Sequence, residues 1–182
     1  MSDPQPPEKV KLVASLFSGD SKIIENALGL LSKKYGLIDY ISSPLSFSYT
    51  DYYEKEFGSP LIRRFVAFER LIRPETLPDI KLWTNGLEKS LSSEGKRSVN
   101  IDPGYLSSAH LILATGKGYS HRPYLRDGIY ADVTLMYQNR EFQVLPWTYP
   151  DYAERTTQEI LSLLREKYLL ELRGEEKKKA GD

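Results

Sequence analysis

The sequence predicts an α+β fold, with a mainly antiparallel sheet and helices largely on one of its faces. Short apolar segments bounded by turn residues recur along the chain and are typical of strands. Helical patterns are too few to cover both faces of an all-parallel sheet, which favours antiparallel pairing. The order of the elements fits a ferredoxin-like β-α-β-β-α-β core with an added hairpin.

The first elements follow a β-α-β order. Residues 10–17 are apolar on both faces and stop at Ser-Gly-Asp, which is typical of a buried strand. A helix capped by Asp20 or Ser21 follows, and its apolar residues recur at intervals of three and four until Gly36 ends it. Residues 38–49 then look extended.

The middle of the chain predicts a loop, a strand and a second helix. Residues 50–58 have the composition of a helical turn or an ordered loop, and residues 61–72 alternate like a strand. Apolar residues within 77–91 follow the spacing of a helix. Gly86 in its middle weakens that helix by about 1 kcal/mol relative to alanine.

The second half of the chain predicts a run of short strands and one long helix. A tight turn at 138–140 joins the last two strands as a hairpin. The helical spacing of 152–172 predicts the final element. The predicted strands are 98–101, 110–115, 128–137 and 141–144.

The chain is expected to form one domain between two flexible ends. Its 182 residues, of which 40% are hydrophobic, suit a single core at 9–172. Residues 1–8 carry three prolines and almost no apolar surface, and 173–182 are densely charged, so both ends are expected to be flexible.

Composition excludes several classes of function. The chain has no cysteine, which rules out thiol catalysis, iron–sulfur clusters and cysteine-ligated zinc, and favours a reducing compartment. Lys plus Arg equals Asp plus Glu at 25 each, so no overall positive field attracts nucleic acid. Apolar runs are far shorter than the roughly 20 residues of a membrane span. We therefore expect a cytoplasmic protein that binds neither membranes nor nucleic acids.

Familiar catalytic and nucleotide-binding motifs are absent. The glycine-rich segment 114–118 lacks the first glycine and the Ser/Thr of a P-loop. Read as G-x-G-x-x-G, its glycines fit the first two positions, but His121 occupies the third. His110 and His121 have neither a partner histidine nor a carboxylate at metal-binding spacing. No metal site is predicted, and the sequence does not identify a cofactor.

Polar residues gather between residues 97 and 152, a stretch that holds both histidines and seven of the thirteen tyrosines. In an extended segment Asn100 and Asp102 point to the same side, and we expect Pro103-Gly104 to turn the chain just after them. Two interpretations are open: a ligand site at a strand end, or an Asx turn in which Asp102 caps its own backbone.

The next loop carries three basic groups, Lys117, His121 and Arg122, which suit an anion. A solvated surface loop is the alternative. Asp132 lies in the middle of a predicted strand, either paired with Arg63 or Arg64 or as part of the site.

Polar residues of 50–58 and of the second predicted helix are expected to rim the same cleft or to face solvent. Asp151 is expected to cap the last helix.

The leading hypothesis is that the chain binds a small anionic ligand, such as a nucleotide or a phosphorylated metabolite. Distant segments of the chain are expected to converge on one concave surface, with Tyr105 or Tyr149 available for stacking. The predicted ligand-binding residues are Arg63, Arg64, Arg97, Asn100, Asp102, Tyr105, Lys117, His121, Arg122, Asp132 and Tyr149.

Two other classes of function are open. A metal-assisted hydrolase or transferase would use Glu54, Asp102, Asp132 and Asp151 to hold Mg²⁺ or Mn²⁺. An RNA- or protein-binding module would use exposed aromatic and arginine side chains, although the neutral charge and the lack of an aromatic RNP pattern argue against RNA.

Seven segments of the chain together carry a resemblance to a known family. They are TDYYEKEFG, Arg63-Arg64-Phe65, IKLWTNGLE, RSVNIDPGYL, LATGKGYSHR, GIYADVTL and PWTYPDY. With these segments the chain resembles the domain-of-unknown-function family 4416 of bacteria and archaea, over residues 9–170. The resemblance implies a small prokaryotic cytosolic protein without an assigned activity. Some members carry a GTP-binding label, but this chain lacks both a P-loop and an N-K-x-D motif. It also has Asp132 and Thr-Gly-Lys-Gly where the family has Glu and Thr-Lys-Asp.

Overall fold

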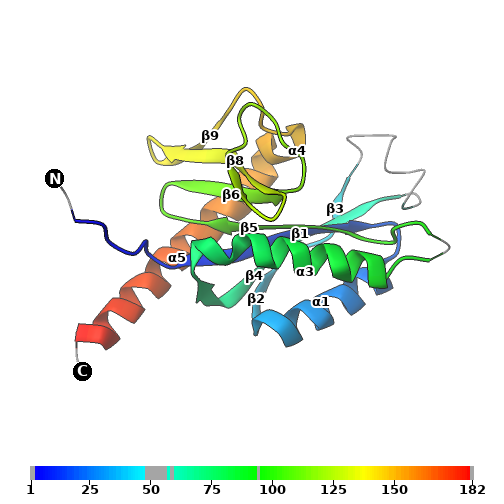
Figure 1. Ribbon diagram of the computed structural model, residues 1–182, viewed down its shortest axis with the longest axis horizontal. Coiled ribbons are helices and arrows are strands. Elements are labelled where there is room, and N and C mark those ends of the chain that lie inside the picture. The colour runs from blue at the N-terminus through cyan, green and yellow to red at the C-terminus, as the bar shows by residue number, and fades with distance from the viewer. Residues whose placement is uncertain (1–2, 48–56, 58–59, 94, 181–182) are drawn as a thin grey trace.

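The computed structural model describes residues 3–47, 57, 60–93 and 95–180 of the chain. Nine strands form one sheet in the order β2-β4-β1-β5-β6-β8-β7, with β3 paired to β4 and β9 paired to β8 (Figure 1). Every pairing between these strands is antiparallel, so the predicted α+β class with a mainly antiparallel sheet is confirmed.

The elements follow one another along the described chain as predicted in outline. They are β1 (Val10–Ser18), α1 (Ser21–Tyr35), β2 (Ile38–Ile41), β3 (Leu45–Ser46), β4 (Ile62–Ile72), the 3-10 turn η1 (Pro74–Thr76), α3 (Leu77–Ser90), β5 (Asn100–Leu106), β6 (His110–Thr115), β7 (Tyr124–Arg126), β8 (Ile129–Gln138), β9 (Glu141–Val144), α4 (Pro150–Ala153) and α5 (Arg155–Ala180).

The N-terminal half forms two interleaved β-α-β units. Strand β4 lies between β1 and β2, while β1 lies between β4 and β5, so each helical crossover spans one intervening strand. A ferredoxin-like identity for the core stays a prediction.

Helices cover both faces of the sheet. The first core layer contains Leu12 and Leu16 of β1 packed against Ile24 and Leu31 of α1 and Ile80 of α3. The second lies on the opposite side of β1, where side chains of α4, α5 and β9 meet the sheet. In Figure 1 α3 lies in front of the sheet and α5 passes behind it. Helix α5 therefore packs on the face of the sheet for which the sequence predicted few helices.

Two predicted boundaries are wrong. Pro103 and Gly104 do not turn the chain: β5 runs through them, paired with Ala14 and Val13 of β1. The last helix is two helices, because Glu154 is extended and separates α4 from α5. Helix α5 also continues to Ala180, past the expected end at residue 172.

The hairpin between β8 and β9 has the tight turn that the sequence predicted. Asn139 and Arg140 form it, with φ angles of 52° and 67°. Both residues are left-handed, as a type I′ turn requires. The predicted loop at 50–58 lies outside the described residues, apart from Phe57. The flexibility expected of 1–8 and 173–182 stays a prediction. Among the described residues, no helix has the length and apolar character to cross a membrane.

Candidate functional site

Strands β5 and β6 pair over only part of their length and then separate. Their paired residues are Gly104 with Leu113, Tyr105 with Ile112 and Leu106 with Leu111. Before Gly104, none of the described strands lies beside the outer edge of β5. Since the strands are antiparallel, the beginning of β5 and the end of β6 lie at the same end of the sheet.

Two residues explain where the strands separate. Pro103 has no N–H, so it cannot donate to a neighbouring strand at the position where β6 departs. Gly104 allows the last close approach: a Cβ built on it would lie 2.4 Å from the carbonyl oxygen of Ile112. The Pro-Gly pair thus ends the pairing between β5 and β6 rather than the strand itself.

Helix α3 supplies hydrogen bonds to the open edge of β5. The Glu88 carboxylate accepts the backbone N–H of Ile101 at 2.6 Å, and Lys81 Nζ donates to the Ile101 carbonyl at 3.0 Å. Both side chains are buried. Polar side chains thereby satisfy the backbone groups that a strand would otherwise bind.

A chain of polar contacts follows this edge. Arg97 donates to the Asn100 side-chain oxygen at 3.3 Å, and the Asn100 amide donates to Asp102 at 2.6 Å. Lys81 lies 3.3 Å from the other oxygen of Asp102, and Arg97 lies 3.6 Å from Glu88. Because two cations and two carboxylates alternate here, the network is neutral overall. The Asx turn considered for Asp102 is not formed.

Glu88 is the most strongly perturbed carboxylate of this network. Burial raises its pKa above the usual value and outweighs the nearby Lys81 ammonium, which acts in the opposite direction together with the N–H of Ile101 and Arg97. Asp102 adds to the increase through charge repulsion.

Arg63 is locked in a buried ion pair with Asp151 of α4. Its guanidinium also lies 4.2 Å from the ring centre of Phe47 and 5.4 Å from that of Tyr152. The expected N-cap role of Asp151 is wrong, since the residue lies inside α4 and Tyr149 takes the cap position. This ion pair joins the edge of β4 to α4.

Three buried polar atoms without hydrogen bonds lie around this pair: Ser15 Oγ, Arg63 Nε and the Tyr152 hydroxyl. Ser15 stands opposite Asp102 in the sheet register. Burial raises the pKa of Tyr152, and the Arg63 charge partly offsets the effect, while Asp102 and Asp151 add to it. The nearby Ser15 hydroxyl lowers the Tyr152 pKa without making a hydrogen bond of ordinary geometry.

The loop between β6 and β7 is held by Arg122. Its Nε donates to Asp132 of β8 at 2.8 Å, and its terminal nitrogens donate to the Lys117 carbonyl at 3.1 Å and the Tyr149 hydroxyl at 2.7 Å. The partner of Asp132 is therefore Arg122, and the prediction that Arg63 or Arg64 would pair with it is wrong. Arg122 organises this loop and has few donors left for a ligand.

His121 lies between aromatic rings beside the same carboxylate. Its ring stacks on that of Trp147, with 4.9 Å between the ring centres and 13° between the ring planes. The centre of the Tyr119 ring lies 5.3 Å from that of His121. Trp147 is fixed by its Nε1, which donates to the Val133 carbonyl at 2.8 Å. The Nε2 atom of His121 is 3.9 Å from Asp132 and has no hydrogen bond.

Several polar and aromatic groups of this region face solvent. Tyr119, Trp147 and Tyr149 are exposed. Lys117 is exposed as well, and within the described part of the chain its ammonium has no hydrogen-bond or ion-pair partner. Exposed rings beside a free cation suit a planar, negatively charged molecule.

Two predicted site residues point away from the others. Arg64 faces the opposite side of β4 from Arg63 and donates to the Ser42 carbonyl. Tyr105 packs with Leu77 and Ile112 in a core layer on the α3 side. Neighbouring residues of a strand point to opposite faces of the sheet, so Arg63 and Arg64 cannot belong to the same site.

The predicted site is thus divided between two polar clusters at one end of the sheet. The edge cluster lies along the open edge of β5 and comprises Lys81, Glu88, Arg97, Asn100 and Asp102. The loop cluster lies over β8 and comprises Lys117, His121, Arg122, Asp132, Trp147 and Tyr149.

A metal centre has no support among the described residues, where no three His, Asp or Glu side chains gather at ligand distances. Asp102, Asp132 and Asp151 instead bind Lys81, Arg122 and Arg63, respectively. Glu54, the fourth residue of that hypothesis, lies outside the described residues.

Sequence reasoning undervalued Lys81 and Glu88, which belong to a helix face interpreted as solvated. The signal was present in their spacing: Leu77, Lys81, Thr84 and Glu88 follow intervals of four, three and four, and all four are buried. Ser15 had no such signal, because it lies among apolar residues in the middle of a buried strand.

Comparisons with known proteins give one result. No curated protein and no solved structure matches the chain. The model of a family described as "Domain of unknown function (DUF4416)" matches residues 8–168, which is most of the chain. The chain therefore belongs to the DUF4416 family.

Proposed function

We propose that this protein binds a small anionic ligand with a planar ring, such as a nucleotide, at the end of the sheet where β5 and β6 separate. The observation that carries the proposal is the loop cluster: Lys117 has no partner among the described residues, and the buried His121 Nε2 has no hydrogen bond. Buried polar groups are normally satisfied, so an unpaired one beside an exposed cation favours a ligand contact.

The anion would contact Lys117 and His121. Arg122 is paired with Asp132 and Arg63 with Asp151. These two arginines therefore hold neighbouring segments in place, and their charges are already neutralised by the carboxylates. Arg97 lies on the edge cluster, where Glu88 and Asn100 hold it. Of the basic groups that composition suggested for the anion, Lys117 and His121 therefore remain available.

The ring would stack on the exposed aromatic surface. The Tyr149 hydroxyl accepts a hydrogen bond from Arg122, which fixes the orientation of the ring while leaving a face exposed. Trp147 is fixed by its hydrogen bond to β8. Rigid aromatic groups lose little conformational entropy on binding, which makes them effective stacking surfaces.

The edge cluster would bind the polar part of the ligand. The Asp102 side chain is 36% exposed although Lys81 and Asn100 contact it, so its carboxylate can also accept from a ligand hydroxyl or amine. Because β5 and β6 are antiparallel, this carboxylate lies at the same end of the sheet as the end of β6, across the gap between the two strands.

The test is a thermal-shift and calorimetry screen of nucleotides and sugar phosphates, with inorganic phosphate as the anion alone. A ligand at 100 times its dissociation constant adds about 2.7 kcal/mol to the free energy of unfolding. We expect Lys117→Ala to weaken binding about tenfold, equivalent to about 1.4 kcal/mol. Lys33→Ala, which removes an exposed lysine of α1, is the matched control.

The proposal fails if no compound in the screen shifts the unfolding transition, or if Lys117→Ala and His121→Ala bind as tightly as the wild type. Binding of single-stranded RNA that weakens steeply with salt, in place of small-molecule binding, would assign the loop cluster to nucleic acid.

A further inference from the structure

Helix α5 carries a solvent-facing stripe opposite to its buried face. The buried side is formed by Thr157, Leu161, Leu164 and Tyr168. On the other side, intervals of four and three residues align five exposed side chains, which we call the α5 stripe. They are Glu159, Leu163, Glu166, Leu170 and Arg173.

Both leucines of the α5 stripe are unusually exposed. The exposed fraction is 53% for Leu163 and 67% for Leu170. They are seven residues apart, and such residues lie on the same side of a helix about 10 Å apart along its axis. A repeated leucine at this interval on an uncovered helix face is typical of a seam between two helices.

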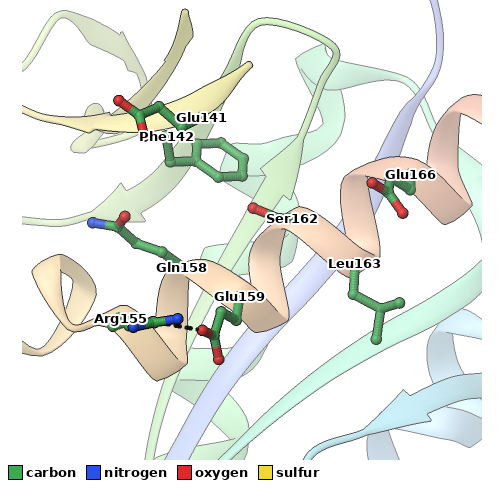
Figure 2. Close-up of a pocket in the computed structure, with 8 residues that line it drawn as sticks. All are labelled: Glu141, Phe142, Arg155, Gln158, Glu159, Ser162, Leu163 and Glu166. Atoms are coloured by element: carbon green, nitrogen blue, oxygen red, sulfur yellow. Dashed lines mark hydrogen bonds and ion pairs between the residues drawn. The ribbon is translucent and has the colours of Figure 1, made fainter. Parts of the chain in front are cut away.

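A groove runs beside the stripe, between α5 and the edge strand β9 (Figure 2). Its volume is about 390 Å³, and its lining includes Glu141, Glu159 and Glu166 together with one basic residue, Arg155. Arg155 is paired with Glu159 at 2.8 Å, so the groove has an excess of negative charge. The surface along the first half of α5 therefore favours a basic partner.

Beyond Glu171, the end of the same helix has an excess of basic residues in the sequence. Residues 173–179 contain four basic and two acidic residues, including Lys177, Lys178 and Lys179 in the sequence. In Figure 1 this end of α5 extends away from the sheet.

We infer that α5 forms an antiparallel pair with α5 of a second copy of this chain. An antiparallel arrangement places Arg173 of each helix beside the acidic groove of the other, so that one contact is made twice about a twofold axis. The same arrangement covers both exposed leucines. A parallel pair would instead place acidic on acidic and basic on basic.

The leucines set the register of the pair. With Leu163 of one copy against Leu170 of the second copy, Glu159 faces Arg173 at both ends of the seam. Glu166 then lies near the twofold axis, close to Glu166 of the second copy. Like charges at that position oppose association, so Glu166→Gln is expected to tighten the dimer.

The first experiment measures the mass of the full chain by sedimentation over a range of concentrations. We expect a dimer that dissociates on dilution, and Leu163→Asp to raise the dissociation constant by at least tenfold. Leu82→Asp is the matched control, because Leu82 is 42% exposed and belongs to α3, which packs on the opposite face of the sheet from α5. A monomer at all concentrations would overturn the inference.

The second experiment uses the absence of native cysteine. In a Leu163→Cys, Leu170→Cys double variant the two residues lie about 10 Å apart along one helix, too far for a disulfide within one chain. We therefore expect oxidation to give covalent dimers. A Leu82→Cys variant, with its cysteine on the opposite face of the sheet, is the control and should stay monomeric on a denaturing gel.

A dimer that forms without the 163–170 cross-link, or that tolerates Leu163→Asp, would show that another surface carries the association. Both experiments are independent of ligand binding at the loop cluster, so their outcomes are separate from the test of the proposed function.

Discussion

Glu88 of α3 binds the backbone N–H of Ile101 in β5, and this side chain takes the place of a neighbouring strand. Lys81 lies seven residues before Glu88 on the same face of α3, and its ammonium binds the carbonyl of Ile101. The pair closes the edge of β5 and leaves the gap toward β6 lined with polar groups. The following predictions depend on this arrangement and on the ion pairs around it.

Removing the Glu88 side chain is expected to destabilise the fold. Glu88→Ala leaves the N–H of Ile101 buried without an acceptor, which costs about 1–3 kcal/mol. Glu88→Gln retains an oxygen acceptor and should cost less. Urea unfolding of the two variants checks the order, and equal losses would contradict the role given to this hydrogen bond.

Glu88 also predicts a pH dependence. Its pKa is raised in the folded protein, so the carboxyl stabilises the fold fully below the pKa of the unfolded chain and loses this contribution as pH rises through the folded pKa. Relative to Glu88→Gln, the wild type should therefore be more stable in acid than near neutrality. Unfolding free energies from about pH 4 to about pH 8 measure the difference. A difference that is constant with pH would contradict the raised pKa.

Breaking the ion pair between Arg63 and Asp151 is expected to be more costly than removing both partners. Arg63→Met leaves a buried carboxylate unpaired and should cost about 3–5 kcal/mol. The double variant Arg63→Met, Asp151→Leu replaces both charges by apolar groups and should recover much of that loss. Additive losses in a double-mutant cycle would mean that the two side chains act independently.

Gly104 is expected to tolerate no side chain. In Gly104→Ala the new Cβ would lie 2.4 Å from the backbone oxygen of Ile112, so a strand must move at a cost of about 1–3 kcal/mol. Gly29→Ala in α1 is the control. Nothing lies within 4 Å of its Cβ, and alanine should stabilise that helix by about 0.5–1 kcal/mol. Thermal unfolding of both variants should therefore shift in opposite directions.

Much of the fold is predictable from the sequence because patterns among neighbouring residues determine many of its elements. The apolar run of β1, the spacing of α1 and the Asn139-Arg140 turn each depend on neighbouring residues, and the structure has all three elements. The extension of β5 through Pro103 was not predictable in this way. It depends on pairing with Ala14, nearly ninety positions away in the sequence.

The candidate site was predictable in location and less so in its partners. The segments around Asn100 and His121 were singled out from their composition, and each lies in a polar cluster. Which carboxylate binds which arginine depends on tertiary packing: Asp132 binds Arg122, and Arg63 binds Asp151. Sequence spacing carries no information on such pairs.

The short ladder between β5 and β6 has a mechanical consequence. Three residue pairs join the half of the sheet that contains β1 and β4 to the half that contains β8. A change of angle at this joint would alter the distance between the two polar clusters, and it would also have to shift the core in which Val13 and Phe65 pack with Leu135. A ligand that contacts both clusters would therefore fix the angle between the halves, and amide hydrogen exchange at Leu111, Ile112 and Leu113 would slow when it binds.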